Sequence, residues 1–198
     1  METVAEKKIG NKTLKLFYDT DTENPRGEDS CKLGTMLYLK NRSYTLGDKE
    51  ATEDEMNVIR KHGALEQVNE LLEGKRPKRY VYLDVHAYIH GGVSLTTARP
   101  GDGNPGYPYT CQWDSLRCGI IYMSYTQVKK TFGDTSPDSI EKAMQAMAAE
   151  VKVFCQWLSG QCYGYVLEDE NGNETDSCWG YIGDSDEVLE MLAKEVAE

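Results

Sequence analysis

Residues 163–183 read YGYVLEDENGNETDSCWGYIG, and this stretch decides how the end of the chain folds. Two runs rich in aromatic residues and glycine flank an acidic turn that contains Asn171-Gly172. An Asn-Gly pair between two alternating runs is a strong signal for a β-hairpin. We therefore predict strands over 163–167 and 175–182, with alternate residues of each strand on opposite faces.

Helices are predicted on both sides of this hairpin. Ser136 is a suitable N-cap, Pro137 fits the first helical position, and Gly160 can end the helix. Apolar residues recur between them at spacings of three and four, which gives one apolar face. These residues are Ile140, Met144, Met147, Val151, Phe154 and Leu158. After the hairpin, Asp184 or Ser185 can cap a last amphipathic helix.

The rest of the chain adds strands and shorter helices. Alternating or β-branched runs predict strands at 12–19, 35–40, 80–89, 93–97 and 118–124. A capping box of Thr52 and Glu55 begins one helix, a second is predicted at 64–73, and Ser124 caps a third. The segment 99–109 is rich in proline and glycine and predicts a structured loop at a functional surface.

This order of elements predicts one α+β domain over residues 1–198. A largely antiparallel sheet would be packed by the long amphipathic helix and by the C-terminal helix. Residues 1–11 are predicted to form a disordered tail.

The formal charge of −11 is concentrated near the C-terminus. The last 34 residues hold eleven acidic side chains and one basic side chain, Lys194. This asymmetry argues against general nucleic-acid binding and suits docking on a basic protein surface. The favoured interpretation of the charge alone is an acidic, solvated face that keeps the protein soluble. The candidate partner-binding residues are Glu168, Asp169, Glu170, Glu174, Asp184, Asp186 and Glu187.

Signatures of cofactor sites are absent from the sequence. It contains no G-x-G-x-x-G, no phosphate-binding loop and no G-x-S-x-G motif. We therefore expect no cofactor and no enzymatic activity. The sequence also has no secretion signal and no apolar run near twenty residues, so we expect neither export nor membrane insertion. Six cysteines without a C-x-x-C pair predict reduced, mostly buried thiols.

Asp84, His86 and His90 are the sharpest candidates for a metal site. They share one face of a predicted strand, and with Asp19 or Asp21 they offer nitrogen and oxygen ligands. An extended strand, however, places residues 86 and 90 about 13 Å apart, too far for one ion. Hydrogen-bonded polar residues on a strand are therefore the favoured interpretation. A cysteine nucleophile paired with His86 or His90 is a further alternative that no spacing supports.

Trp113 and Trp179 each lie beside an Asp-Ser pair. The favoured interpretation is structural: the polar pair holds a turn and the indole packs against the sheet. Cys178 would then belong to the scaffold as well. The alternative is an exposed aromatic and acidic surface that binds a partner.

An ordered set of short motifs resembles a widespread family of small proteins carried by bacteriophages, plasmids and other mobile elements of bacteria. The motifs are Asp19-Thr20-Asp21, Asn24-Pro25-Arg26, Leu33-Gly34-Thr35-Met36, Tyr44-Thr45-Leu46-Gly47-Asp48, the segment from Asp84 to His90, Gly92-Val93-Ser94-Leu95, Trp113-Asp114-Ser115, Gly119-Ile120-Ile121-Tyr122, Tyr163-Gly164-Tyr165-Val166 and Asp176-Ser177-Cys178-Trp179-Gly180-Tyr181. The likeness covers about residues 14 to 183. Where the family commonly has Asp-His-Ser-Gly, this chain has a longer segment ending in His90-Gly91-Gly92, which weakens any histidine-based site.

The resemblance implies an accessory protein in the cytoplasm of a bacterial host, with no assigned reaction and so no catalytic residue to carry over. A small, acidic protein of a mobile element is similar in profile to anti-defence inhibitors, including anti-CRISPR proteins that bind Cas nucleases. We therefore expect a non-enzymatic inhibitor that binds a host defence nuclease or its nucleic-acid complex. The alternatives are a small metal-dependent enzyme or metal-binding regulator that uses the Asp and His residues above, and an accessory protein that binds a phage component.

Overall fold

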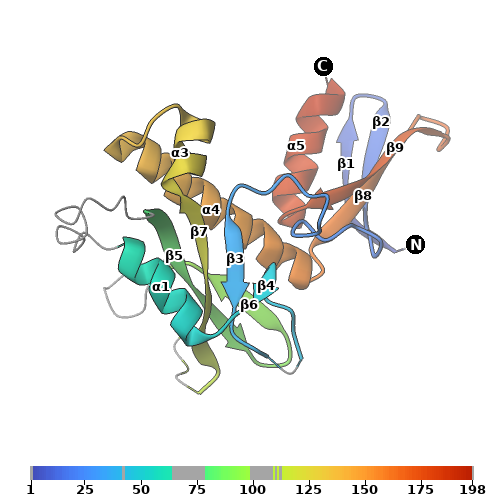
Figure 1. The fold of residues 1–198 in the computed structure, drawn as a ribbon. Coiled ribbons are helices and arrows are strands. Elements are labelled where there is room, and N and C mark those ends of the chain that lie inside the picture. The colour runs from blue at the N-terminus through green and yellow to red at the C-terminus, as the bar shows by residue number, and fades with distance from the viewer. Residues whose placement is uncertain are drawn as a thin grey trace. The chain divides into compact units, whose positions relative to one another are not determined.

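The structure is a computed structural model that describes residues 2–41, 43–63, 79–98, 109, 111 and 113–197. The predicted helix at 64–73 and almost all of the predicted loop at 99–109 lie outside these residues. The chain divides into two compact units (Figure 1). Met1–Pro25 and Val153–Glu198 form the first, which we call the terminal unit, and Arg26–Lys152 forms the second, the central unit.

The predicted α+β class is confirmed. The described residues form four helices and two mostly antiparallel sheets, one sheet in each unit. The sequence predicted one sheet, because strand patterns show which segments are extended but not which segments pair. Within the described residues, no helix combines the length and the apolar character needed to cross a membrane.

The sheet of the terminal unit has four antiparallel strands in the order β1-β2-β8-β9. They are β1 (Thr3–Ile9), β2 (Lys12–Tyr18), β8 (Cys162–Glu168) and β9 (Glu174–Ile182), and helix α5 (Ser185–Ala197) follows them. Alternate residues of β2 and β8 point to one face, where they pack against residues of α5. Figure 1 shows α5 beside this sheet. This buried core contains Leu14, Leu16, Tyr163, Tyr165, Leu167, Val188, Leu189, Leu192 and Ala193.

The predicted hairpin at the end of the chain is confirmed as β8 and β9. In its turn, the N–H of Gly172 donates to the carbonyl of Asp169 at 3.1 Å. Gly172 has a φ of +79°, whereas Asn171 keeps a negative φ. The turn is therefore a type I turn followed by a left-handed glycine, a common way to close a three-residue hairpin loop.

The predicted disordered tail at residues 1–11 is wrong. Thr3–Ile9 forms β1, which pairs antiparallel with β2 from Ala5↔Leu16 to Ile9↔Lys12. Gly10 closes the turn with a φ of +62°. The strand is short and rich in charge, as edge strands often are, and so its sequence resembles a polar tail.

The sheet of the central unit has the order β4-β3-β7-β5-β6. The strands are β3 (Thr35–Tyr38), β4 (Lys49–Glu50), β5 (Tyr80–Ile89), β6 (Val93–Thr96) and β7 (Ser115–Ser124). The helix α1 (Glu53–Gly63) begins at the predicted capping box and packs on β5 and β7. The helix α3 (Tyr125–Phe132) begins at a second capping box, Ser124 with Gln127.

Helix α4 (Pro137–Leu158) contributes residues to both units. The predicted apolar face is confirmed at Met147, Val151 and Phe154, which are buried, whereas Ile140 and Leu158 are only partly buried. Met144 is 38% exposed, and the fully buried Ala143 takes its place in the core. The buried stripe is thus displaced by one residue in the first half of the helix.

A buried arginine organises the central unit. The Arg26 side chain is 2% exposed and donates two hydrogen bonds to Asp48, at 2.8 and 2.6 Å. It also donates to Glu150 at 3.1 Å and to the carbonyl of Gly34 at 2.7 Å. Burial raises the pKa of Asp48, but hydrogen bonds from Arg26 and from the Met36 N–H outweigh burial and lower this pKa overall.

Candidate partner-binding site

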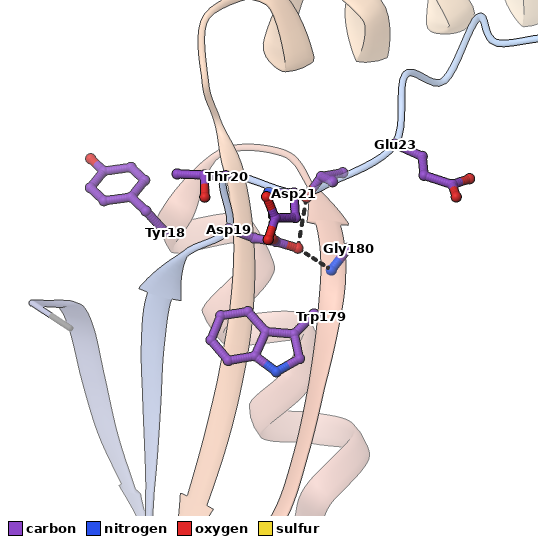
Figure 2. A pocket seen from close by; sticks show the side chains of 8 residues that line it. Tyr18, Asp19, Thr20, Asp21, Glu23, Trp179 and Gly180 are labelled. Atoms are coloured by element: carbon purple, nitrogen blue, oxygen red, sulfur yellow. Dashed lines mark hydrogen bonds between the residues drawn. The ribbon is translucent and has the colours of Figure 1, made fainter.

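A β-bulge near the end of β9 shapes one end of the terminal unit. Tyr163 pairs with Tyr181 and Gly164 pairs with Trp179, so Gly180 is an extra residue in β9. Its φ is +95°, in the left-handed region that favours glycine. Its N–H donates to Asp19 Oδ2 at 3.0 Å (Figure 2).

Asp19 joins this bulge to the loop that follows β2. Its carboxylate also accepts hydrogen bonds from the Asp21 N–H at 2.9 Å and from Thr22 Oγ1 at 2.8 Å. The loop is held a second time by the Trp157 indole, which donates to the carbonyl of Thr22 at 3.0 Å. The predicted metal ligand Asp19 is therefore a structural acceptor for three donors.

Trp179 lies across the sheet opposite Gly164. A Cβ atom on Gly164 would come within 2.0 Å of Trp179 Cε3, so glycine leaves the room that the indole occupies. Trp179 packs on β8 as predicted, yet it remains 42% exposed. It therefore belongs both to the scaffold and to the surface.

The loop and the end of β9 enclose an open pocket of about 670 Å³ (Figure 2). Its lining consists of Tyr18, Asp19, Thr20, Asp21, Thr22, Glu23, Trp179 and Gly180. Tyr18 is 59% exposed and stacks on Tyr163, with 5.5 Å between the ring centroids. Three carboxylates and two aromatic rings make this lining suited to cationic groups rather than to anions.

The net charge of the protein resides in the terminal unit. That unit contains 16 acidic side chains, five lysines and no arginine, for a formal charge of −11. The whole chain also has a charge of −11, so the central unit is formally neutral. The charge asymmetry seen in the sequence is therefore an asymmetry between two folded bodies.

The predicted partner-binding acids form two groups at opposite ends of the β8–β9 hairpin. Glu168, Asp169, Glu170 and Glu174 lie at the turn, whereas Asp184, Asp186 and Glu187 follow the far end of β9. At roughly 3.3 Å per residue, a strand of this length separates the groups by well over 20 Å.

The group at the turn is partly neutralised. Glu168 forms an ion pair with Lys15 at 2.7 Å, and the four lysines of β1 and β2 lie toward this end of the sheet. Asp169 accepts three hydrogen bonds from Asn171 and Asn173. Those from Asn173 contribute most to lowering the pKa of Asp169. Much of this group therefore stabilises the turn itself.

The second group joins the pocket at the other end of the sheet. Asp184 Oδ1 accepts from the Asp186 N–H at 3.1 Å and begins α5. The loop after β2 is fixed to the same end, since the Asp19 N–H donates to the carbonyl of Cys162 at 2.8 Å. We call the resulting set the acidic end: Asp19, Asp21, Glu23, Asp184, Asp186 and Glu187.

The predicted metal ligands of the central unit have separate surroundings. Asp84 accepts a hydrogen bond from Arg60 Nε at 2.9 Å, and His86 is buried. The side chain of His90 is 72% exposed, with its Nδ1 3.4 Å from Asp114 Oδ2. In the described part of the chain, no three His, Cys, Asp or Glu side chains converge as metal ligands. Asp19 and Asp21 belong to the other unit.

Two expectations about burial are wrong. Trp113 is 87% exposed, because it lies in the turn before β7 rather than on a strand. The cysteines are not mostly buried either: only Cys118 and Cys162 are, whereas Cys31 and Cys178 are exposed. Cys178 lies in the stretch of β9 from 174 to 180, in which every residue is exposed.

Several of the short motifs noted in the sequence meet in the fold. Asp19-Thr20-Asp21 lies against Trp179-Gly180 at the pocket, although 161 positions separate Asp19 from Gly180. Arg26 and Asp48 form the buried ion pair of the central unit. In comparisons with known proteins, the chain matches no protein-family model, no curated protein and no solved structure.

Proposed function

We propose that this chain is a non-enzymatic accessory protein that binds a basic protein surface through its acidic end. The observation that carries the proposal is the separation of charge, −11 in the terminal unit and zero in the central unit. A field of one sign on one compact body steers a partner of opposite sign and raises the association rate.

Exposed aromatic residues support this choice of surface. Tyr18 is 59% exposed and Trp179 is 42% exposed, and both line the pocket among the carboxylates. Tyrosine and tryptophan are the side chains that most often dominate binding energy at protein interfaces. The acidic end thus offers aromatic anchors together with a charged rim.

The class of partner that we propose is a host defence nuclease, such as a Cas nuclease, or its nucleic-acid complex. Nucleases hold an anionic polymer in a basic channel, and a body of charge −11 can compete for such a channel. The resemblance to proteins of mobile elements supports an anti-defence role. The same negative charge argues against direct binding of nucleic acid.

The test is binding and inhibition of purified defence nucleases at 50 and 500 mM NaCl. We expect Asp21→Lys/Glu23→Lys to weaken binding at least tenfold at low salt. The matched control is Glu28→Lys/Asp29→Lys, which makes the same charge change at exposed residues of the central unit and should bind normally. Absence of any bound or inhibited nuclease would overturn the proposal, and so would equal losses in the two variants.

The alternative of a metal-dependent enzyme gains no support from the described residues, because Asp84 is engaged by Arg60 and Asp19 by backbone and hydroxyl donors. Metal analysis of the purified protein is the direct check. One equivalent of bound metal would restore this alternative.

A further inference from the structure

Among the residues that the structure describes, β9 is an edge strand: it pairs with β8 on one side and with no strand on the other. Helix α5 packs mainly against β1 and β2, the two strands farthest from β9 (Figure 1). Seven consecutive residues of β9, from 174 to 180, are exposed, so neither face of this stretch is covered. An edge strand presents unpaired N–H and C=O groups along its outer side, and these can pair with another extended chain.

Two bulges set the length of the available edge. Leu167 pairs with Asp176 and Glu168 with Glu174, so Thr175 is an extra residue, just as Gly180 is. The regular part is Asp176 to Trp179, which spans about 10 Å. The Gly180 N–H at its end donates to Asp19, and within it the Ser177 N–H donates to Asp176 Oδ1 at 2.9 Å, a contact that an added strand would replace. An added strand therefore has room to pair with these four residues.

The charge of the edge identifies the kind of chain that fits. β9 carries Glu174 and Asp176 and no basic residue. The Asp176 carboxylate is held in place by the Tyr165 hydroxyl, which donates to it at 2.7 Å. A lysine or arginine opposite Asp176 would form a favourable cross-strand pair. A second copy of this chain fits poorly, because it would bring another unit of charge −11.

The two faces of the sheet at β9 favour different side chains in an added strand. Ser177 and Trp179 point to the face that also carries Phe17 and Val166, both partly buried. Apolar residues of an added strand would extend this face beside the exposed indole. Basic residues would lie on the face of Asp176, so the suitable segment alternates basic and apolar residues.

We propose that β9 accepts an extended segment of the partner protein, with alternating basic and apolar residues, as a fifth strand paired along Asp176–Trp179. This inference rests on the proposed function and deepens it, because it names the form in which the basic partner is held. The main chain supplies affinity through strand pairing, and the alternation supplies specificity.

The test uses the full chain and a synthetic probe, the peptide Ac-KVKVKVK-NH2. Its control is the same peptide N-methylated at alternate residues, which keeps the charge but removes the N–H groups of one edge. We expect the parent peptide to protect the amides of β9 from hydrogen exchange and to bind at least tenfold more tightly than the methylated peptide. Equal binding of the two peptides would show that charge alone attracts the peptide. Failure of both peptides to bind would show that the outer side of β9 does not accept a strand. Either result overturns the inference.

Variants in β9 and in β1, the two edge strands of this sheet, test where the added strand binds. Asp176→Lys should weaken binding of the parent peptide at least tenfold. Glu6→Lys makes the same charge change on an exposed residue of β1, the opposite edge, and should leave binding unchanged. The reverse result would place the added strand on β1 and overturn the inference. Binding to a whole nuclease is measured separately, so strand pairing can fail while the proposed function stands.

Discussion

Asp19 fixes the bulge of β9 with a single carboxylate, which accepts from Asp21, Thr22 and Gly180. Replacing it with alanine leaves these donors without their partner. We expect Asp19→Ala to lower the free energy of unfolding by about 1–3 kcal/mol, measured by urea titration. Asp21→Ala is the control, because it removes the same charge from an exposed neighbour and should cost far less. Equal losses would show that charge, rather than hydrogen bonding, is what Asp19 contributes.

Gly164 and Trp179 form a matched pair. A methyl group on Gly164 collides with the indole, so Gly164→Ala should cost about 1–3 kcal/mol in unfolding free energy and change the tryptophan fluorescence. The collision disappears in a Trp179→Ala background, where the same substitution should cost much less. A double-mutant cycle measures this coupling. Additive effects of the two substitutions would show that residue 164 and the Trp179 indole do not pack against each other.

At the scale of elements, helix α5 holds the terminal unit together by covering one face of its sheet. Leu192 is 1% exposed, whereas its neighbour Met191 is 48% exposed. We expect Leu192→Ala to destabilise the protein by about 2–5 kcal/mol and Met191→Ala by well under 1 kcal/mol. Urea unfolding followed by tryptophan fluorescence reports this unit through Trp157 and Trp179. Similar costs for both variants would mean that α5 does not pack as described.

Local sequence signals were sufficient to predict elements that begin or end at a capping residue or a turn residue. The capping boxes at Thr52 and Ser124 and the Asn171-Gly172 turn each satisfy backbone groups with nearby side chains or by a favoured conformation. β1 was missed because an edge strand needs only one apolar face and tolerates charge on the other. Met144 was misplaced because a long helix drifts relative to a pattern of threes and fours.

The candidate site could be predicted only in part. Its chemistry was visible, since aromatic and acidic residues stand together near Trp179 and near Asp19. Its geometry was not visible, because these two segments meet only through the pairing of β2 with β8, and no local pattern fixes a partner so far along the chain. The C-terminal acids are close together in the sequence, but β9 separates them into two groups at opposite ends of the hairpin.

For the whole molecule, the division of charge predicts two different responses to salt. Self-repulsion within a unit of charge −11 opposes its compact state and is screened by added ions. We expect 0.5 M NaCl to stabilise the terminal unit by on the order of 1 kcal/mol, a roughly fivefold slowing of its amide exchange. Hydrogen exchange measured by mass spectrometry can follow β2 and β8 against β5 and β7. Equal slowing in both units would show that the effect is not electrostatic.

The terminal unit is built from the two ends of the chain, and this has a consequence for its synthesis. β1 and β2 leave the ribosome before the central unit, yet Leu14 and Leu16 find their packing partners on β8 and α5 only after about 140 further residues. Because translation adds roughly 5–20 residues per second, the apolar face of the β1–β2 hairpin stays uncovered for on the order of 10 s. The central unit is complete before then. Its folding therefore precedes that of the body that surrounds it in sequence, and a chain that stalls before β8 would be a client for chaperones.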